Sequence, residues 1–364
     1  KSYETVFLER GSVFRESVTS TGIHYKAYGD EQQPLPVVSG GIQIENWELW
    51  ENSENIYKAA CPQPIQHLYV GGQIQTIARY PNTGWLRVGE GSTSEVLVDN
   101  NLTNHPGNKE DYWKGATLRW RKWSWWYEIR KVTGYDAATG TIYSEHTVDS
   151  PPESERVGIG AGYYLDGLLS ELDSPGEWVY VAEEQAVYWW PEEGILPQDA
   201  DVEGSTRATG IVSGGSGVQI EGIAFEYQNE TALKVTGRTS ISNCSFKNIS
   251  QTALTLTWGA GGSLLSGSEF ADILQCAVWW NENPGNTESS RITGNTINRV
   301  AHIPGYGGSG IMKDIAISLI NHNNKMVVEY NRITDVGYAG IWMRDGKATV
   351  RRNVLTRCMS ALND

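Results

Sequence analysis

The sequence predicts an all-β protein whose main part is a solenoid, and three observations support this. Glycine accounts for 40 of the 364 residues, well above the usual share of about 7%. Tryptophan (15) outnumbers phenylalanine (5), which favours a turn-rich β protein with many aromatic surfaces. A unit of slightly more than twenty residues repeats from residue 216 onward. The repeat is the most informative of the three, because a fixed period of this length is typical of stacked coils.

Each repeated unit reads as a short strand, an Asn- or Gly-bearing turn, and two further strands. Asn331 and Asn353 are 22 residues apart, and Asn243 and Gly267 are 24 apart. The unit containing Asn295 is lengthened by a Gly-rich insert at 305–310. Apolar and polar residues alternate within the strands, so each unit predicts one coil of a solenoid.

Aligning the coils on their turns stacks the last strand of each unit and separates its two faces. Residues that share the interior face are Leu233/Val235, Leu254/Leu256, Val278/Trp280, Ile317/Leu319 and Ile341/Met343. Residues on the outward face are Lys234, Thr255, Trp279, Asn281, Ser318, Trp342 and Arg344, with Asp364 beside Trp342 one coil later. Because stacked coils lie about 4.8 Å apart, the outward face predicts a continuous wall able to contact an extended ligand.

We expect three segments along the chain. Residues 1–46 read as early coils, 47–200 as an inserted Trp-rich all-β domain resembling a sandwich or barrel, and 201–364 as the main solenoid. Eleven of the 15 tryptophans fall in the middle segment, whose strands alternate without the coil period. A coil starts at residue 1 and another is incomplete at residue 364, so we expect the sequence to be cut from a longer chain.

Charge and hydropathy exclude several classes of partner. The chain carries 29 Lys and Arg against 43 Asp and Glu, a net charge of −14, which opposes binding to nucleic acid or an anionic membrane. No apolar run approaches the roughly 20 residues of a membrane-spanning helix. No Gly-rich phosphate-binding loop follows a strand and precedes a helix, so we expect no organic cofactor.

Several stretches match a known group of proteins. FLERGSVFRESV, HYKAYGDEQQPLPVVSGG, LYVGGQIQTIARYPN and the final NVLTRCMSALND resemble right-handed parallel β-helix enzymes that are secreted and act on polysaccharides. This superfamily includes xylosidase-like and fucosidase-like glycoside hydrolases, and polysaccharide lyases and epimerases. The resemblance implies a right-handed parallel β-helix interrupted by an inserted β domain, a carbohydrate substrate, and an extracellular or bacterial periplasmic location.

Glycoside hydrolysis uses two carboxyl groups that flank the scissile bond. The candidates are Asp345, Asp364, Glu282 and Asp314. Asp345 and Asp364 are three residues and one coil apart, roughly 11 Å between backbones, and side chains can shorten this to the roughly 6.5–9.5 Å of inverting enzymes. The structural alternatives are a turn-forming Asp-Gly pair for Asp345, and solvated loop charges for Glu282 and Asp314.

Substrate-binding candidates lie beside these carboxylates. Trp279 and Trp342 face outward, and a flat exposed aromatic ring suits stacking on a sugar. Arg344 offers a planar donor group, and Asn281 lies on the same outward face. His322 is a candidate to hold a hydroxyl or tune an acid, with a surface histidine of no special role as the alternative.

The family resemblance does not transfer a complete catalytic pair. In β-helix xylosidases, a strand like AGIWMRDG carries a carboxylate soon after its Trp, which approximately matches Asp345. The partner carboxylate implied by the resemblance falls near Lys325, where this chain departs from the pattern.

Two other functions remain open at this stage. A uronate lyase or epimerase needs a strong base and a cation, often Ca²⁺, to neutralise the substrate carboxylate. Lys313, Lys325 and Arg344 are candidate bases, but no close run of Asp resembles a calcium site, and we expect no metal. A non-catalytic binding solenoid, such as an adhesin or tailspike, needs the outward tryptophans without a carboxylate pair.

Overall fold

The computed structural model describes residues 4–123, 126–145, 158–283, 285–308, 310–311, 314–323 and 325–360. Within these ranges the regular elements are β-strands and short 3₁₀ helices. None of the helices in this part of the chain has the length and hydrophobicity to cross a membrane. The chain divides into two compact units, one of residues 1–42, 204–307 and 312–363, and one of residues 43–203 and 308–311.

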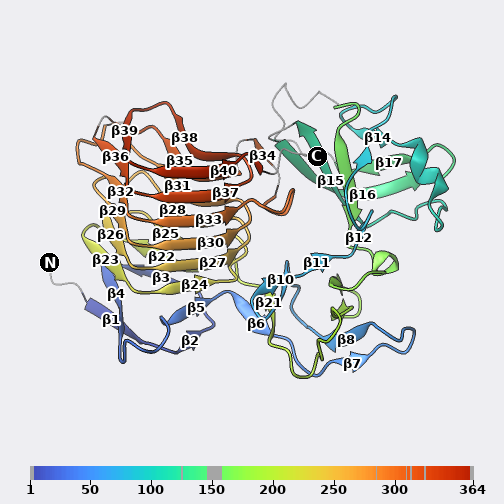
Figure 1. Cartoon of the computed structure of the whole chain (residues 1–364), viewed down its shortest axis with the longest axis horizontal. Helices are drawn as coiled ribbons and strands as arrows, with labels where there is room; N and C mark the ends of the chain where they lie inside the picture. The colour runs from blue at the N-terminus through green and yellow to red at the C-terminus, as the bar shows by residue number, and fades with distance from the viewer. Residues whose placement is uncertain are drawn as a thin grey trace. The chain divides into compact units, whose positions relative to one another are not determined.

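The first unit consists of three parallel sheets whose strands follow one another around each coil (Figure 1). Sheet A contains β1 (Glu4–Glu9), β4 (Ile23–Tyr28), β23 (Val218–Glu221), β26 (Thr239–Ser242), β29 (Leu264–Ser266), β32 (Arg291–Thr293), β36 (Met326–Glu329) and β39 (Ala348–Arg351). Sheet B contains β2 (Val13–Phe14), β5 (Val37–Ser39), β24 (Ala224–Glu226), β27 (Ser245–Ile249), β30 (Glu269–Ile273), β33 (Thr296–Val300), β37 (Arg332–Val336) and β40 (Val354–Cys358). Sheet C contains β3 (Val18–Thr21), β22 (Thr209–Gly214), β25 (Thr231–Val235), β28 (Thr252–Leu256), β31 (Cys276–Asn281), β35 (Ile315–Ile320) and β38 (Ala339–Arg344).

This arrangement is a parallel β-helix, as the sequence predicts, and it is interrupted inside a coil. Strands β4 and β5 begin the second coil, and the chain then leaves for residues 43–203. Strand β22 completes that coil by pairing in parallel with β3 on one side and β25 on the other.

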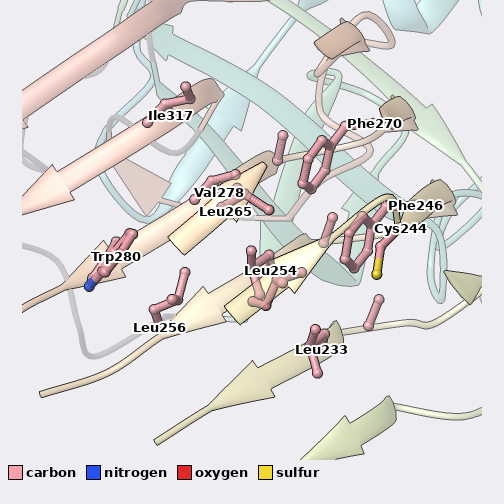
Figure 2. Close-up of a cluster of buried hydrophobic side chains, with 14 of the residues drawn as sticks. Leu233, Cys244, Phe246, Leu254, Leu256, Leu265, Phe270, Val278, Trp280 and Ile317 are labelled. Carbon is pink, nitrogen blue, oxygen red and sulfur yellow. The ribbon is translucent and has the colours of Figure 1, made fainter. Parts of the chain in front are cut away.

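The interior of the coils is filled by aligned apolar columns (Figure 2). The predicted column Leu233, Leu254, Val278 and Ile317 is confirmed, because these residues pair in register and have no exposed surface. In sheet B the rings of Phe225, Phe246 and Phe270 stack with centroids 5.0 and 4.6 Å apart. The next column, which contains Trp280, is buried except at Met343, which is 42% exposed. Burial of these columns stabilises the stacked coils.

The Asn-bearing turns form a hydrogen-bonded ladder inside the helix. Asn295 donates its backbone N–H to the Oδ1 atom of Asn331 at 3.0 Å, and Asn331 donates in the same way to Asn353 at 2.9 Å. The side-chain amides of Asn295 and Asn331 repeat these contacts at 2.9 Å. The ladder satisfies backbone groups that would otherwise be buried without partners.

The second unit is built from other sheets. One contains β10 (Gln73–Ile74), β9 (Leu68–Val70), β21 (Val202–Ser205) and β6 (Gly41–Gln43), and another contains β11 (Thr76–Ile77), β19 (Glu177–Val181), β20 (Ala186–Trp189), β8 (Tyr57–Ala60) and β7 (Glu48–Leu49). The largest contains β12 (Arg79–Tyr80), β18 (Gly162–Asp166), β15 (Thr117–Trp123), β16 (Trp126–Asp136), β17 (Thr141–Ser144), β14 (Val96–Val98), β13 (Leu86–Arg87) and β34 (Gly310–Ile311). The short 3₁₀ helices are η1 (Asn100–Asn104) and η3 (Leu169–Glu171). Trp113 and Trp120 lie in the core of this unit.

Candidate functional site

The outward face of sheet C carries one continuous row of side chains across four steps. Pairing joins Lys234 to Thr255, Thr255 to Trp279, Trp279 to Ser318, and Ser318 to Trp342. This is the row that the coil alignment predicts. Trp279 and Trp342 are half-buried and lie two coils apart, about 9.6 Å along the helix axis. Ser318 lies between them and is only 3% exposed, so the two rings flank a small residue.

Asp345 follows this row at the end of β38. It has a φ of +53°, a left-handed conformation that Asp tolerates in turns. Its side chain is 63% exposed, and its Oδ2 atom accepts a hydrogen bond from Nε of Arg344 at 2.8 Å. Asp345 is thus both a turn residue and an exposed carboxylate beside the tryptophan row.

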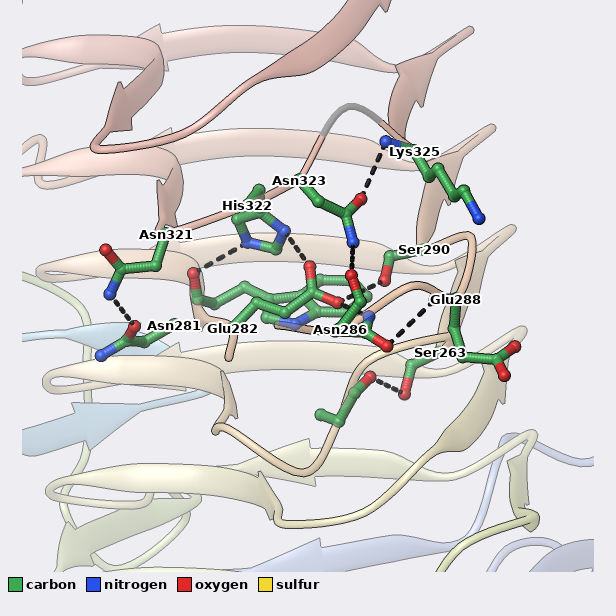
Figure 3. Close-up of polar contacts among 12 residues, drawn as sticks. Ser263, Asn281, Glu282, Asn286, Glu288, Ser290, Asn321, His322, Asn323 and Lys325 are labelled. Carbon is green, nitrogen blue, oxygen red and sulfur yellow. Dashed lines mark hydrogen bonds and ion pairs between the residues drawn. The ribbon is translucent and has the colours of Figure 1, made fainter. Parts of the chain in front are cut away.

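Glu282 and His322 form a fully buried pair at the ends of β31 and β35 (Figure 3). The Oε2 atom of Glu282 lies 2.5 Å from Nδ1 of His322, and both side chains have no exposed surface. The other ring nitrogen, Nε2, lies 3.1 Å from the carbonyl oxygen of Trp280. A carbonyl oxygen only accepts, so we assign a proton to Nε2.

The close contact gives each of these buried groups a polar partner. Oε2 of Glu282 and Nδ1 of His322 face each other with no exposed side-chain surface on either residue. Removing one partner would leave the other ionisable group buried alone, which is costly.

The second carboxylate oxygen of Glu282 is also occupied. Oε1 accepts from the side-chain amide of Asn286 and from the hydroxyl of Ser290, the latter at 3.2 Å. Asn323 in turn donates to the backbone carbonyl of Asn286. These contacts correct two expectations: Glu282 is not a solvated loop charge, and His322 is not a surface histidine. The segments that follow β31 and β35 bond to each other and enclose both side chains.

The buried pair supports the turn that carries Asp345. His322 accepts a hydrogen bond from the backbone N–H of Lys347 at 2.8 Å. A Cβ atom on Gly346 would come within 2.5 Å of the backbone nitrogen of His322, so only glycine fits at this close approach. The Asp345–Gly346 turn thus rests on the backbone of His322, whose ring is held by Glu282.

Asp314 lies at the opposite end of sheet C from Asp345. It directly precedes β35, whereas Asp345 directly follows β38, its neighbour in register. Cys276 at the start of β31 pairs with Ile315, the residue after Asp314. Burial, with a smaller contribution from the charge of Asp314, raises the pKa of the Cys276 thiol to about 12. Six strand residues at about 3.3 Å each separate the two carboxylates, too far for one sugar bond.

The remaining predicted residues occupy separate positions. Asn281 accepts a hydrogen bond from the side chain of Asn321 at 3.0 Å on the outward face. Lys325 donates to the backbone carbonyl of Thr287 at 2.5 Å. Asp364 lies outside the described residues. Among the described residues, no group of three or more His, Cys, Asp and Glu side chains is arranged to hold a metal ion.

Sequence reasoning missed the contacts that fix this site. Glu282 and His322 come from neighbouring coils, and Asn281 pairs with Ile320. Extending that register by one and two residues would have brought Glu282 next to Asn321 and His322. No local motif marks Asn286 or Ser290 as partners of Glu282.

The comparisons with known proteins support the fold. Residues 185–355 match the family model described as a right-handed β-helix region, which agrees with the parallel β-helix of the first unit. No curated protein matches the sequence significantly.

A solved structure titled "Glycoside hydrolase" resembles the chain in fold, with a TM-score of 0.77 and 18% sequence identity; the match covers 93% of this chain and 72% of that one. Another, titled "The complex structure of XylC with xylose", has a TM-score of 0.43 and 11% identity, covering 97% of this chain and 61% of that one.

Proposed function

We propose that this protein is a glycoside hydrolase that binds a polysaccharide or oligosaccharide along the outward face of sheet C. The observation that carries the proposal is the row Trp279–Ser318–Trp342, which ends beside Asp345. Two tryptophans whose backbones lie two coils apart, about 9.6 Å, on either side of a small residue suit stacking on separated sugar units of one extended chain. The fold similarity to a glycoside hydrolase is consistent with this function.

In this proposal Asp345 is one of the two catalytic carboxyl groups. Its side chain is exposed at this end of the sheet, and its Oδ2 atom lies 2.8 Å from Nε of Arg344. Asp364 is the proposed partner, and the coil register predicts it close to Trp342. A separation of about 6.5–9.5 Å between the two groups would give inversion at the anomeric carbon.

Glu282 has a supporting role in this scheme rather than a catalytic one. A carboxyl group with no exposed surface and two occupied oxygens does not reach a sugar. Its function is to hold His322, and through His322 the turn of Asp345. The proposal also places the protein outside the cytoplasm, where polysaccharides are available.

The test is an assay of the purified protein on neutral and uronic plant and algal polysaccharides. Reducing ends and absorbance near 235 nm, which reports the unsaturated product of a lyase, are recorded together. We expect new reducing ends without absorbance, and a loss of about 10²–10⁴-fold in rate for Asp345→Asn. Asp364→Asn should lose activity to a similar extent.

A matched control is Glu269→Gln, which neutralises an exposed carboxylate on sheet B and should keep full activity. Absorbance that rises with chain cleavage would establish a lyase and overturn the two-carboxylate mechanism. Retained binding with neither signal would favour a non-catalytic carbohydrate-binding β-helix.

A further inference from the structure

The second unit contains a cleft that the proposed activity does not use. It has a volume of about 380 Å³ and is lined by Trp50, Lys58 and Tyr188, together with Glu48, Leu49, Glu51, Asn52 and Glu184. This volume falls in the range of about 300–1,000 Å³ that is typical of clefts for small ligands. All lining residues belong to residues 43–203, so the cleft is complete within one unit.

One wall of the cleft is a row fixed by strand pairing. Glu48 of β7 pairs with Lys58 of β8, and Lys58 pairs with Tyr188 of β20. Lys58 lies 2.5 Å from Glu184, which also accepts the hydroxyl of Tyr188 at 2.6 Å. Hydrogen bonds to Lys58 and Tyr188 lower the pKa of Glu184, so this carboxylate is ionised and accepts hydrogen bonds.

Trp50, the tryptophan of the cleft, is held in place before any ligand arrives. The ring of Trp50 contacts Tyr188 edge to face, with centroids 5.1 Å apart. The backbone of Trp50 donates to Ile56 at 2.8 Å and accepts from Ser53 at 3.0 Å. Ser53 also caps the loop by accepting from the backbone of Ile56 at 3.2 Å. A fixed ring loses little conformational freedom when it binds a ligand.

We propose that this cleft is a second carbohydrate-binding site, specific for neutral sugar units. The half-exposed Trp50 offers an apolar surface for the C–H face of a pyranose. Glu48, Glu51 and Asn52 accept hydrogen bonds from hydroxyl groups, and the ammonium of Lys58 donates to ring or hydroxyl oxygens. Three carboxylates against one ammonium give an excess of negative charge, which repels uronates and sulfated sugars.

The inference extends the proposed function, because it assumes a carbohydrate ligand, but the cleft does not depend on the hydrolytic site. Binding at the cleft would hold a polymer on the protein independently of the sheet C face. Two sites on one chain raise the effective concentration of the polymer at each of them.

The test is calorimetric titration of the full chain carrying Asp345→Asn, with cellohexaose, mannohexaose and xylohexaose as neutral probes and trigalacturonate as the anionic probe. Trp50→Ala and Glu51→Lys should each weaken binding of at least one neutral hexaose by about tenfold or more, equivalent to about 1.4 kcal/mol. Trp50→Phe keeps an aromatic ring and should keep most of the affinity. Trp258→Ala removes a tryptophan that is 61% exposed outside the cleft and should bind as the parent does.

Hydrogen exchange locates the bound probe without any substitution at the cleft. Neutral hexaose should protect backbone amides in 48–60 and 181–190, and trigalacturonate should not. The inference is wrong if no neutral probe binds, if Trp50→Ala and Glu51→Lys titrate like the parent, or if protection is confined to sheet C. Absence of hydrolysis together with binding that depends on Trp50 would reject the proposed function and leave this site standing.

Discussion

The Nδ1 atom of His322 and the Oε2 atom of Glu282 lie 2.5 Å apart although the two residues belong to successive coils. The contact is buried, and the backbone of His322 supports the turn of the exposed Asp345. Sequence alone treats Glu282 and Asp345 as equivalent catalytic candidates. In the structure Glu282 is a buried structural group, whereas the carboxylate of Asp345 is available to a ligand.

Substitutions at Glu282 should distinguish these roles. Glu282→Gln keeps an oxygen for Asn286 and Ser290 and places an amide donor against Nδ1 of a neutral His322. This variant should fold and keep its activity. Glu282→Ala leaves the imidazole without its buried partner and should lower the free energy of unfolding by about 3–5 kcal/mol, measured by urea denaturation. A stable but inactive Glu282→Gln protein would show that Glu282 is catalytic.

The two outward tryptophans of sheet C should contribute to substrate binding. Trp279→Ala and Trp342→Ala should each raise KM by about tenfold with a smaller effect on kcat, because stacking stabilises bound substrate and transition state alike. Both constants are measured by steady-state kinetics on whichever polysaccharide the protein hydrolyses. Trp258→Ala is the matched control and should leave KM unchanged. Equal KM values for all three variants would remove the tryptophan row from the site.

The asparagine ladder should contribute to stability. Asn331→Ala removes the acceptor for the backbone N–H of Asn295 and leaves that group buried. A buried unpaired donor costs about 1–3 kcal/mol, which urea unfolding of the variant would reveal. Asn101→Ala changes an exposed asparagine of η1 and should shift stability much less. A loss for Asn331→Ala no larger than for this control would mean that the ladder is energetically neutral.

The pH dependence of stability should show the effect of His67. Burial, followed by the charge of Arg119, lowers the pKa of His67 to about 3, against about 6.5 in an unfolded chain. Between these values the unfolded state binds the extra proton, so the contribution of His67 is complete above about pH 6.5 and falls on acidification by up to about 1.4 kcal/mol per pH unit.

The measurement is the difference in unfolding free energy between wild type and His67→Gln from pH 7.5 to 4. Taking the difference cancels the contributions of groups that favour the folded state on acidification. Glu177 is one of them, because burial raises its pKa to about 7. The wild type should lose more stability on acidification than the variant. Parallel curves would show that the folded state protonates His67 as easily as the unfolded one.

The coil register was predictable from sequence because side chains alternate with a period of two and coils repeat with nearly constant length. That logic places Leu254 over Leu233 and Trp279 beside Thr255 and Ser318, as the structure has them. A slip of one residue would expose an entire apolar column, so the register is strongly determined.

The burial of Glu282 and His322 was not predictable in the same way. Loops have no period, and whether a loop carboxylate faces water depends on the neighbouring segment. Here Asn323 and Asn286 connect the segments after β35 and β31, and this contact has no signature in either stretch of sequence. Asp345 was predictable, in contrast. Its Asp-Gly sequence predicts a turn, and a turn at the end of a strand exposes the side chain.

The interruption of the second coil sets the order in which the molecule can form. Val18 of β3 pairs with Ile211 of β22, so 193 residues must be synthesised before that edge of β3 is covered. At about 5–20 residues per second this takes about 10–40 s. During that time this edge of β3 has no pairing partner. The residues of the second unit are synthesised in the same interval and are available to fold. The coils after β22 therefore have no strand of sheet C to pair with until β22 is made, and they can then add in the order of translation.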